Sequence, residues 1–195
     1  MVKITPADLE IVFLKARTLS RWQKKDVPDT VLKDVYAAAA MGPTEGNCQP
    51  MRVVFVKSGP EKEKLKACLW NGNVEKTISA PVTAVIAADT RFYEKWPVLF
   101  PFADMRSLYE KTPDMMKTCL SRNTALQAAY LMIAARALGL DCGPMAGFDA
   151  KKINETFFPD GRYKVDFLCN LGYGDWDTLP PRAPRLTFED ACQIV

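Results

Sequence analysis

Arginine and hydroxyl side chains gather in the segment Arg17-Thr18-Leu19-Ser20-Arg21, directly after the first predicted helix. A phosphate monoester carries a charge of about −1.5 to −2 and presents acceptor oxygens that guanidinium and hydroxyl groups satisfy. Pro181-Arg182-Ala183-Pro184-Arg185 adds further cations near the C-terminus, where the prolines favour extended backbone. A basic helix end and a basic tail are the plainer alternatives, and composition alone leaves both open.

Three segments rich in glycine and asparagine offer backbone and amide groups to a ligand. In GPTEGNCQP (42–50), glycines on either side of Thr44-Glu45 permit close backbone approach, and Asn47 supplies both a donor and an acceptor. Asn73 and Lys76 lie about one helical turn apart, so they can face the same ligand. CGPMAGF (142–148) exposes backbone amides at a strand end. Each segment also has a purely structural alternative. These are a helix C-cap and turn for 42–50, a helix N-cap with a solvated lysine for Asn73 and Lys76, and a tight connection for 142–148.

The chain contains no histidine, which excludes a Ser-His or Cys-His nucleophile pair and removes the commonest zinc ligand. Its 6 cysteines are scattered without a CxxC pair, which favours reduced thiols in the cytoplasm and gives no reason to expect a metal site. An enzyme with this composition would rely on unusual work by polar side chains or on a bound organic cofactor.

Length and composition indicate one globular domain over residues 1–195, with 48% hydrophobic residues. The net charge of +3 is weak and evenly spread, which argues against non-specific nucleic-acid binding and favours small-molecule partners. The chain has no apolar run of about 18 residues and its N-terminus lacks the pattern of a signal peptide. These features argue against membrane insertion and secretion.

Hydrophobic periodicity and capping signals predict a layered α+β domain. The helix over 113–139 is apolar on almost every side in its centre, so we expect it between layers or at a subunit interface. The aromatic residues of 91–111 have no clear period and predict a covering excursion. We expect helices at 5–17, 28–41, 61–69, 74–79, 113–139 and from 149, and strands at 51–57, from 82, at 141–143 and within 165–174.

Five motifs, taken in order, resemble those of the flavin-dependent nitroreductase family over nearly the whole chain. They are ARTLSRW, GPTEGNCQP, NGNVEKTISAP, ALGLDCGPMAGFD and LGYGDWDTLPPRAPR. The spellings ARALGLDCGPMAGFD and FLCNLGYGD, with the paired PRxPR, look like the branch that contains malonic semialdehyde reductases of pyrimidine degradation. The resemblance implies a three-layer α-β-α sandwich with a mixed, mostly antiparallel sheet. It also implies a homodimer that binds FMN in two interfacial clefts, with each C-terminal tail extending over the partner.

The same resemblance implies a role for each motif in holding the flavin. Lys76 would stabilise the anionic reduced flavin and raise its reduction potential. Gln49 would reach toward the flavin of the other subunit. The remaining implied cofactor contacts are Pro43, Thr44, Glu45 and Asn47 along the flavin, Arg17, Thr18, Arg21, Arg182 and Arg185 at the phosphate, Asn73 at the pyrimidine edge, and the amides of Ala146 and Gly147 near N5.

The activity that the resemblance implies is an FMN-dependent ping-pong oxidoreduction. NADH or NADPH would deliver hydride to flavin N5 and leave, after which an oxidised substrate would accept it, plausibly malonic semialdehyde reduced to 3-hydroxypropionate. Arg106 or Arg122 would pair with the substrate carboxylate. The alternatives are a broad-specificity nitro or quinone reductase and a flavin-binding protein without turnover. The side chains expected to form a lid are Phe92, Trp96, Phe100 and Phe102.

Overall fold

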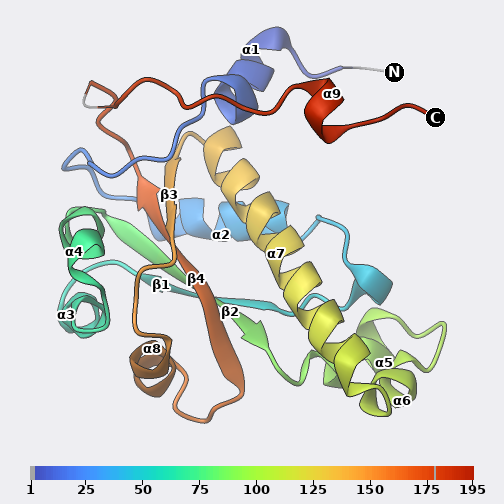
Figure 1. Cartoon of the computed structure of the whole chain (residues 1–195). Coiled ribbons are helices and arrows are strands. Elements are labelled where there is room, and N and C mark those ends of the chain that lie inside the picture. The colour runs from blue at the N-terminus through green and yellow to red at the C-terminus, as the bar shows by residue number, and fades with distance from the viewer. Residues whose placement is uncertain (1–2, 178) are drawn as a thin grey trace.

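An antiparallel sheet forms the middle layer of the molecule (Figure 1). The structure is a computed structural model that describes residues 3–177 and 179–195. Within those residues the sheet has four strands in the order β1-β2-β4-β3, and a parallel bridge joins Thr18 to Cys142 beside it. The predicted α+β sandwich is confirmed. The strands are β1 (Met51–Val56), β2 (Val82–Asp89), β3 (Asp141–Met145) and β4 (Tyr163–Gly172).

One face of the sheet is covered by α2 (Asp29–Ala39) and the long α7 (Pro113–Ala137). Apolar side chains at helical spacing on both helices pack together and against the sheet, which confirms the helices predicted from periodicity. This cluster includes Leu32, Val35, Ala39, Ile86, Leu131, Ala135 and Leu171.

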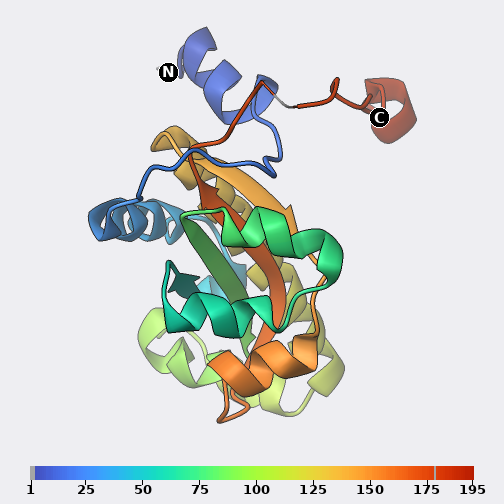
Figure 2. The same ribbon diagram turned by 90° about the vertical axis from the view of Figure 1, so that its left-hand side faces the viewer.

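The opposite face carries α3 (Pro60–Lys66), α4 (Asn71–Ile78) and α8 (Ala150–Phe157), which lie in front of the strands in Figure 2. Helices therefore cover both faces of β2, and every residue of that strand is buried. A strand buried on both sides needs apolar residues at successive positions rather than in alternation, which explains the run VTAVIAA.

Lys62 of α3 is buried beneath this layer, where its Nζ donates hydrogen bonds to Ala80 O and Thr83 Oγ1, both at 3.0 Å. Burial lowers the pKa of Lys62 from 10.5 to about 8. Between these two values the unfolded chain binds more protons than the folded one, so the free energy of unfolding rises with pH.

We expect stability to increase from about pH 8 toward pH 10.5 because the burial cost of the Lys62 charge is relieved in that window. Lys62→Met should remove this rise. The check is urea denaturation at pH 7, 8, 9 and 10, with Lys66→Met, an exposed lysine of the same helix, as the matched control. An unchanged pH dependence in Lys62→Met would contradict the expectation.

The N-terminal helix begins with the predicted cap, in which the Thr5 side chain accepts from Asp8 N and Asp8 accepts from Thr5 N. It comprises α1 (Pro6–Leu9) and the π-helical turn η1 (Glu10–Leu14). The prediction that it continues to Arg17 is wrong. The chain leaves the helix because its next residues pair with β3, where Leu19 N donates to Cys142 O at 3.0 Å.

The excursion after β2 contains η3 (Phe92–Lys95), α5 (Trp96–Leu99) and α6 (Met105–Glu110). Together with the short turn η2 (Glu45–Asn47), it surrounds the N-terminal end of α7. The predicted covering segment is therefore built of short helices, which no single period in the sequence could indicate.

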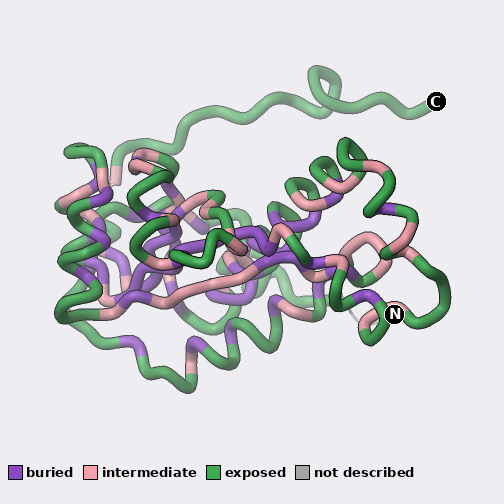
Figure 3. The backbone as a smooth tube through the Cα atoms, turned by 90° about the horizontal axis from the view of Figure 1, so that it is seen from below, coloured by how far each residue is buried: buried purple, intermediate pink, exposed green. Residues whose placement is uncertain are grey.

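The C-terminal segment runs away from the body of the molecule and carries α9 (Phe188–Ala191). Residues 180–195 are exposed throughout, as the green tube in Figure 3 shows. The exposed side chains include four large apolar ones, Leu186, Phe188, Ile194 and Val195. Across residues 3–177 and 179–195, no helix combines the length and the apolar character that crossing a bilayer requires.

Candidate functional site

Four arginines from three segments of the sequence line one cavity of about 450 Å³, and three of them were predicted to act together. Arg17 comes from the segment that pairs with β3, and Arg182 and Arg185 come from the C-terminal segment. No acidic side chain is among the described residues that line this cavity, so it favours an anion. The structure thus brings together the arginines that the sequence predicted to act together. The other lining residues are Phe13, Ala16, Thr18, Arg136, Pro180, Pro181 and Ala183.

Hydrogen bonds to backbone carbonyls fasten the two arginine-bearing segments to each other. Arg17 Nη2 donates to Pro180 O at 2.7 Å. Arg182 Nη2 donates in return to Leu14 O and Ala16 O, both at 2.8 Å, and so satisfies carbonyls at the end of the first helix. Each guanidinium keeps further N–H groups that these bonds do not use. The cavity therefore combines a fixed shape with spare donors.

Arg136, in the last turn of α7, also lines this cavity and was not predicted from the sequence. Its Nε is buried without a hydrogen-bond partner among the described residues, and its Nη1 makes only a long bond of 3.4 Å to Val12 O. The Arg136 guanidinium adds a further positive charge to the cavity lining, which strengthens the preference for an anion. The sequence did not reveal this position in the cavity, because an arginine in the last turn of a helix is already explained by its favourable interaction with the helix dipole.

Ser20 and Arg21 are exposed and lie outside the residues that line the cavity. Thr18 lines it, and its neighbour Leu19 is buried against β3. Because Arg21 lies outside the cavity, its position does not support the predicted phosphate contact. The position of Thr18 in the cavity lining does support the contact predicted for it.

Gly143 of β3 fixes how closely the arginine-bearing segment approaches the sheet. A Cβ at this position would lie 2.4 Å from Leu19 O, a backbone atom that cannot move aside cheaply. We expect Gly143→Ala to push the segment outward and destabilise the fold by about 1–3 kcal/mol, the usual cost of overpacking.

The measurement for Gly143→Ala is the midpoint of urea denaturation together with FMN affinity. Gly72→Ala is the matched control, because a Cβ there would meet nothing within 4 Å. Equal midpoints for the two variants would contradict the close approach described above.

The first turn of α4 is bound to the connection that follows β3. Asn73 Nδ2 donates to Gly147 O at 2.7 Å, and Trp70 N donates to the same oxygen at 3.2 Å. A Cβ at Gly147 would lie 2.4 Å from Asn73 Nδ2, so this position needs glycine for the contact to form. The structure therefore brings together Asn73 and Gly147, two residues that the sequence analysis assigned to different parts of the flavin ring.

Lys76 lies on the same helix, half-buried, and its carbonyl is held by two side chains. Trp22 Nε1 and Asn170 Nδ2 donate to Lys76 O at 2.9 and 3.0 Å. These bonds fix the backbone that carries the ammonium group. Ala146, next to Gly147, is exposed and leaves its backbone accessible.

The segment GPTEGNCQP (42–50), which we predicted to contact the flavin, has left-handed backbone at Gly46, Asn47 and Gln49. The φ angles are 53° at Gly46, 50° at Asn47 and 41° at Gln49. Asparagine visits this region readily, but glutamine does so rarely, and such positions cost about 1–3 kcal/mol each. Strain of this kind is found where a surrounding structure holds a functional loop in place.

Hydrogen bonds from the excursion hold the strained loop. Trp96 Nε1 donates to Gly46 O at 2.8 Å, and Asn47 Nδ2 donates to Leu99 O at 2.9 Å. Gln49 Nε2 in turn donates to Asn47 Oδ1 at 2.7 Å. The side chain of Asn47, predicted to contact the flavin, is thus engaged on both its nitrogen and its oxygen.

Glu45 is held by α6 and α7 rather than left free along the loop. Tyr109 donates a hydrogen bond to its carboxylate, and Arg122 Nη1 lies 3.5 Å from Oε2. The backbone N of Glu45 donates to Asn123 Oδ1 at 2.8 Å. Burial, and next the bond to Glu45, raise the pKa of Tyr109 above its usual range. Pro43 and Thr44 complete the loop, and Thr44 Oγ1 accepts from Gln49 N at 3.3 Å.

The predicted lid residues fall into two groups. Phe92 and Trp96 are buried, at 0% and 1% exposure, and pack edge to face at 5.2 Å. Both side chains are part of the buried cluster that supports the loop. The prediction that they form a lid is therefore not supported by their burial. Phe100 and the exposed Phe102 line a cavity of about 360 Å³ together with Arg106, and the buried Trp96 forms part of its wall. Phe100 and Phe102 remain the candidates for a lid.

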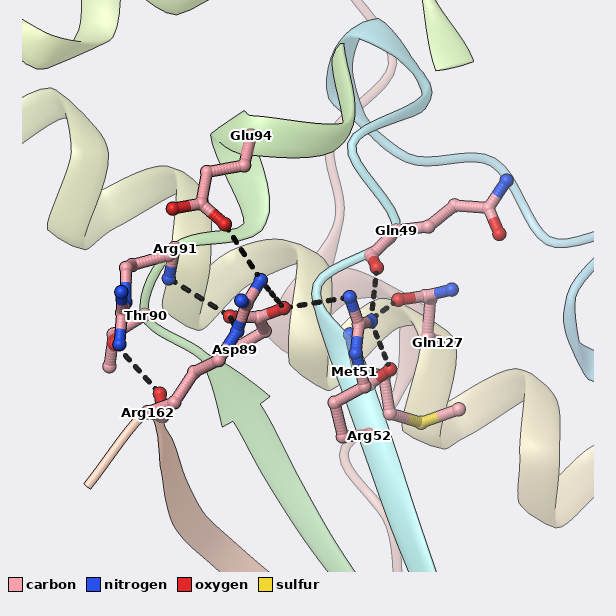
Figure 4. Close-up of polar contacts among 9 residues, drawn as sticks. All are labelled: Gln49, Met51, Arg52, Asp89, Thr90, Arg91, Glu94, Gln127 and Arg162. Carbon is pink, nitrogen blue, oxygen red and sulfur yellow. Dashed lines mark hydrogen bonds and ion pairs between the residues drawn. The ribbon is translucent and has the colours of Figure 1, made fainter. Parts of the chain in front are cut away.

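A buried carboxylate anchors the strand end of the loop (Figure 4). Asp89, at 0% exposure, accepts from Arg52 Nη2 at 2.8 Å and from Arg162 Nε and Nη2 at 2.9 and 3.1 Å. Arg52 Nη1 also donates to Gln49 O and Met51 O, both at 2.9 Å. The network was not predicted, although an acid at the end of an apolar strand is a signal that could have indicated it.

Glu45 of the loop contacts the middle of α7, whereas the arginine cavity lies at the C-terminal end of this helix. Asn123 contacts the loop and Arg136 lines the cavity, and the rise of 1.5 Å per residue separates them by about 20 Å along the helix axis. Within residues 3–177 and 179–195, the cavity that Glu45 lines and the cavity that the arginines line share no residue. One copy of the chain therefore presents two separate parts of the predicted site.

Comparisons with known proteins identify the family of the chain. Residues 15–173 match the model of the nitroreductase family. A protein of Ralstonia nicotianae named as an NADH dehydrogenase/NAD(P)H nitroreductase is 51% identical over 195 residues, with 100% of both chains covered.

Two solved structures share the fold at low identity. The nitroreductase ydfN of Bacillus subtilis aligns with a TM-score of 0.87 and 22% identity over 98% of this chain and 100% of that one. A nitroreductase of Exiguobacterium sibiricum in complex with FMN aligns with a TM-score of 0.82 and 19% identity over 100% of each chain. The family match and the full-length relative lead to one conclusion: the chain belongs to the nitroreductase family.

Proposed function

We propose that the chain is an FMN-dependent NAD(P)H oxidoreductase. The observation that carries the proposal is the cavity in which Arg17, Arg182 and Arg185 converge, joined by Arg136 with its unpaired Nε. A phosphate dianion satisfies such a set of donors. The family membership supports the same cofactor, as do the name of the Ralstonia protein and the FMN complex of the Exiguobacterium protein.

FMN, when bound, supplies a centre that accepts hydride from a nicotinamide and passes it to a substrate. In the proposal, the arginines hold the phosphate, and the Asn73–Gly147 contact positions the backbone of residues 146–147 against the ring. Lys76 contributes positive charge, which favours the reduced, anionic form. The loop 43–49 closes the opposite side and excludes water.

The proposal includes a homodimer, because the two parts of the site lie about 20 Å apart in one copy. A second copy can bring its loop to the first copy's arginine cavity. Leu126 and Tyr130 of α7 are exposed, at 41% and 38%, as are the apolar side chains of the C-terminal segment. Burial of these surfaces against a partner would remove them from water. Gln49 then faces the partner's cofactor, as the sequence predicted.

The primary test is a visible absorption spectrum of the purified protein reconstituted with FMN. We expect a yellow protein that NADH or NADPH bleaches under nitrogen and that an added oxidant restores. Sedimentation of the same sample should give a dimer. Failure to retain FMN, or a strictly monomeric holoprotein, would contradict the proposal. A yellow protein that neither nicotinamide bleaches would favour a flavin-binding protein without turnover.

For the substrate, we propose a small aldehyde acid, with malonic semialdehyde as the specific candidate. The motif spellings support this choice, and so does the presence of Arg106 and Arg122 beside two cavities of about 360 and 340 Å³. Arg122 is better suited to a carboxylate, because its contact with Glu45 is long and its side chain is 60% exposed. Arg106 is already paired with Glu110 at 2.8 Å.

The substrate test is steady-state turnover on malonic semialdehyde compared with nitroaromatics and quinones. We expect Arg122→Ala to raise KM for the aldehyde acid by about tenfold, the loss of one charge-assisted contact, and to leave nitroaromatic turnover unchanged. A clear preference for nitroaromatics in the wild type would instead establish a broad-specificity reductase. A cytoplasmic location stays a prediction of the sequence.

A further inference from the structure

The Sγ atoms of Cys48 and Cys119 lie 3.9 Å apart, and the two thiols come from elements that face each other. Cys48 ends the η2 turn of the loop 42–50, and Cys119 lies on α7. Both side chains are almost completely buried, at 1% and 2% exposure. A disulfide requires about 2.05 Å between sulfur atoms, so the pair must close by less than 2 Å.

The surroundings of the two thiols are unequal. Asn123 Nδ2 lies 3.3 Å from Cys119 Sγ and donates to it. The Cys48 thiol also donates a hydrogen bond to Cys119 Sγ. This bond lowers the pKa of Cys119 and raises the pKa of Cys48. Burial and the Glu45 carboxylate oppose the shift at Cys119. Cys119 is therefore the better nucleophile, and Cys48 retains its proton.

Cys119 also has a route to small solutes. It lines a cavity of about 340 Å³ with Glu45, Tyr109, Asp114, Met115, Thr118 and Arg122. Hydrogen peroxide is small enough to enter a space of this size. The buried pair can thus meet an oxidant without unfolding.

We propose that Cys119 and Cys48 form a peroxide-sensitive dithiol site, in which a hydroperoxide oxidises Cys119 and Cys48 then closes an intrachain disulfide. The Cys119 sulfur attacks one oxygen of hydrogen peroxide, an S–O bond forms, the O–O bond breaks, and the leaving hydroxide takes up a proton as water. Cys48 Sγ next attacks the Cys119 sulfur. The S–S bond forms, the S–O bond breaks, and hydroxide leaves as water with the Cys48 proton. Two thiols lose two electrons, and one peroxide gains them.

The disulfide changes the shape of the loop 42–50. Cys48 lies between Asn47 and Gln49, whose left-handed backbone is held by hydrogen bonds to neighbouring elements. Drawing Cys48 toward α7 displaces both residues together. This second step rests on the proposed function, because it assigns the loop to FMN. The expected consequence is an FMN affinity lower by about tenfold, within the range usual for coupling between two sites.

The first experiment maps thiols in the dithiothreitol-reduced holoprotein after treatment with an equimolar amount of hydrogen peroxide. The protein is denatured in iodoacetamide, digested and analysed by mass spectrometry. We expect a peptide pair joined through Cys48 and Cys119 and lighter by two hydrogen atoms, with Cys142 and Cys169 alkylated. Dithiothreitol should restore the alkylated forms. Alkylation of both Cys48 and Cys119, at a dose that oxidises the exposed Cys192, would overturn the proposal.

Variants separate the two thiols. Cys48→Ser should halt oxidation at the Cys119 sulfenic acid, which dimedone labels, and Cys119→Ser should give no linked peptide. Cys192→Ser, at the exposed cysteine outside the pair, is the matched control and should form the disulfide as the wild type does. If a serine variant does not fold, the wild-type peptide map alone decides.

Coupling to the loop is tested by FMN titration of the reduced and oxidised protein. We expect the oxidised form to bind FMN about tenfold more weakly and saturating FMN to shift the dithiol–disulfide equilibrium toward the dithiol by the same factor, as reciprocity requires. Equal affinities would overturn the coupling and leave the disulfide in place. Reduced protein that binds no FMN would contradict the proposed function, since the peptide map does not depend on the flavin.

Discussion

Replacing both Arg17 and Arg185 with alanine is expected to weaken FMN binding by about two to four orders of magnitude, because each hydrogen bond to a charged group contributes about 1.5–3 kcal/mol. Both arginines line the same cavity although they lie far apart in the sequence. Binding of riboflavin, which lacks the phosphate, should change much less. The measurement is fluorescence titration of the apoprotein with each flavin.

Arg91→Ala is the matched control for this pair, because Arg91 is an exposed arginine outside the cavity. It should bind FMN as the wild type does. An equal loss of FMN and riboflavin binding in the double variant would mean that the arginines only hold the C-terminal segment in place and do not bind the phosphate. Unchanged FMN binding would remove the observation on which the proposed function depends.

Replacing Asp89 with alanine is expected to lower the free energy of unfolding by about 3 kcal/mol, at the lower end of the range for breaking a buried ion pair. The carboxylate is completely buried, whereas Arg52 and Arg162 keep 29% and 22% of their side chains exposed. Water can therefore solvate part of the two guanidinium groups that lose their partner. The melting temperature should fall by about 6–12 °C.

Urea denaturation measures this effect, and an unchanged slope with a lower midpoint would assign it to the folded state. Asp34→Ala, at an exposed position of α2, serves as the control and should stay within about 0.5 kcal/mol of the wild type. Because Arg52 also donates to Gln49 O, Asp89→Ala should loosen the loop as well. A midpoint equal to that of Asp34→Ala would show that the buried network does not stabilise the protein.

The layers of the fold were predictable because their signals are local. The apolar run of β2, the periodicity of α2 and α7 and the Thr5–Asp8 cap each specify an element without reference to the rest of the chain. Composition excluded histidine chemistry, and motif order indicated the family. The resemblance predicted that Arg17, Arg182 and Arg185 converge on a phosphate across two protomers; in the structure they line one cavity within a single copy, and their phosphate role stays a prediction.

The remaining features depend on long-range contacts that a single pattern does not encode. Asp89 meets Arg162 only because β2 pairs with β4, and Arg136 meets the cavity only because α7 ends beside the first helix. The aromatic residues Phe92 and Trp96 resembled a lid, yet the short helices around them bury both. Aromatic residues indicate that a segment has large apolar side chains to bury. They do not indicate whether those side chains lie in the protein core or over a substrate site.

The left-handed backbone at Asn47 and Gln49 has a practical consequence for engineering the enzyme. A saturation library spread evenly over the loop would lose most of its members at these two positions, because branched and bulky residues resist this conformation. Glycine, asparagine and aspartate are the substitutions that leave the peptide path intact. Diversity is better placed at exposed Phe102 and Arg122, where a changed side chain costs little stability.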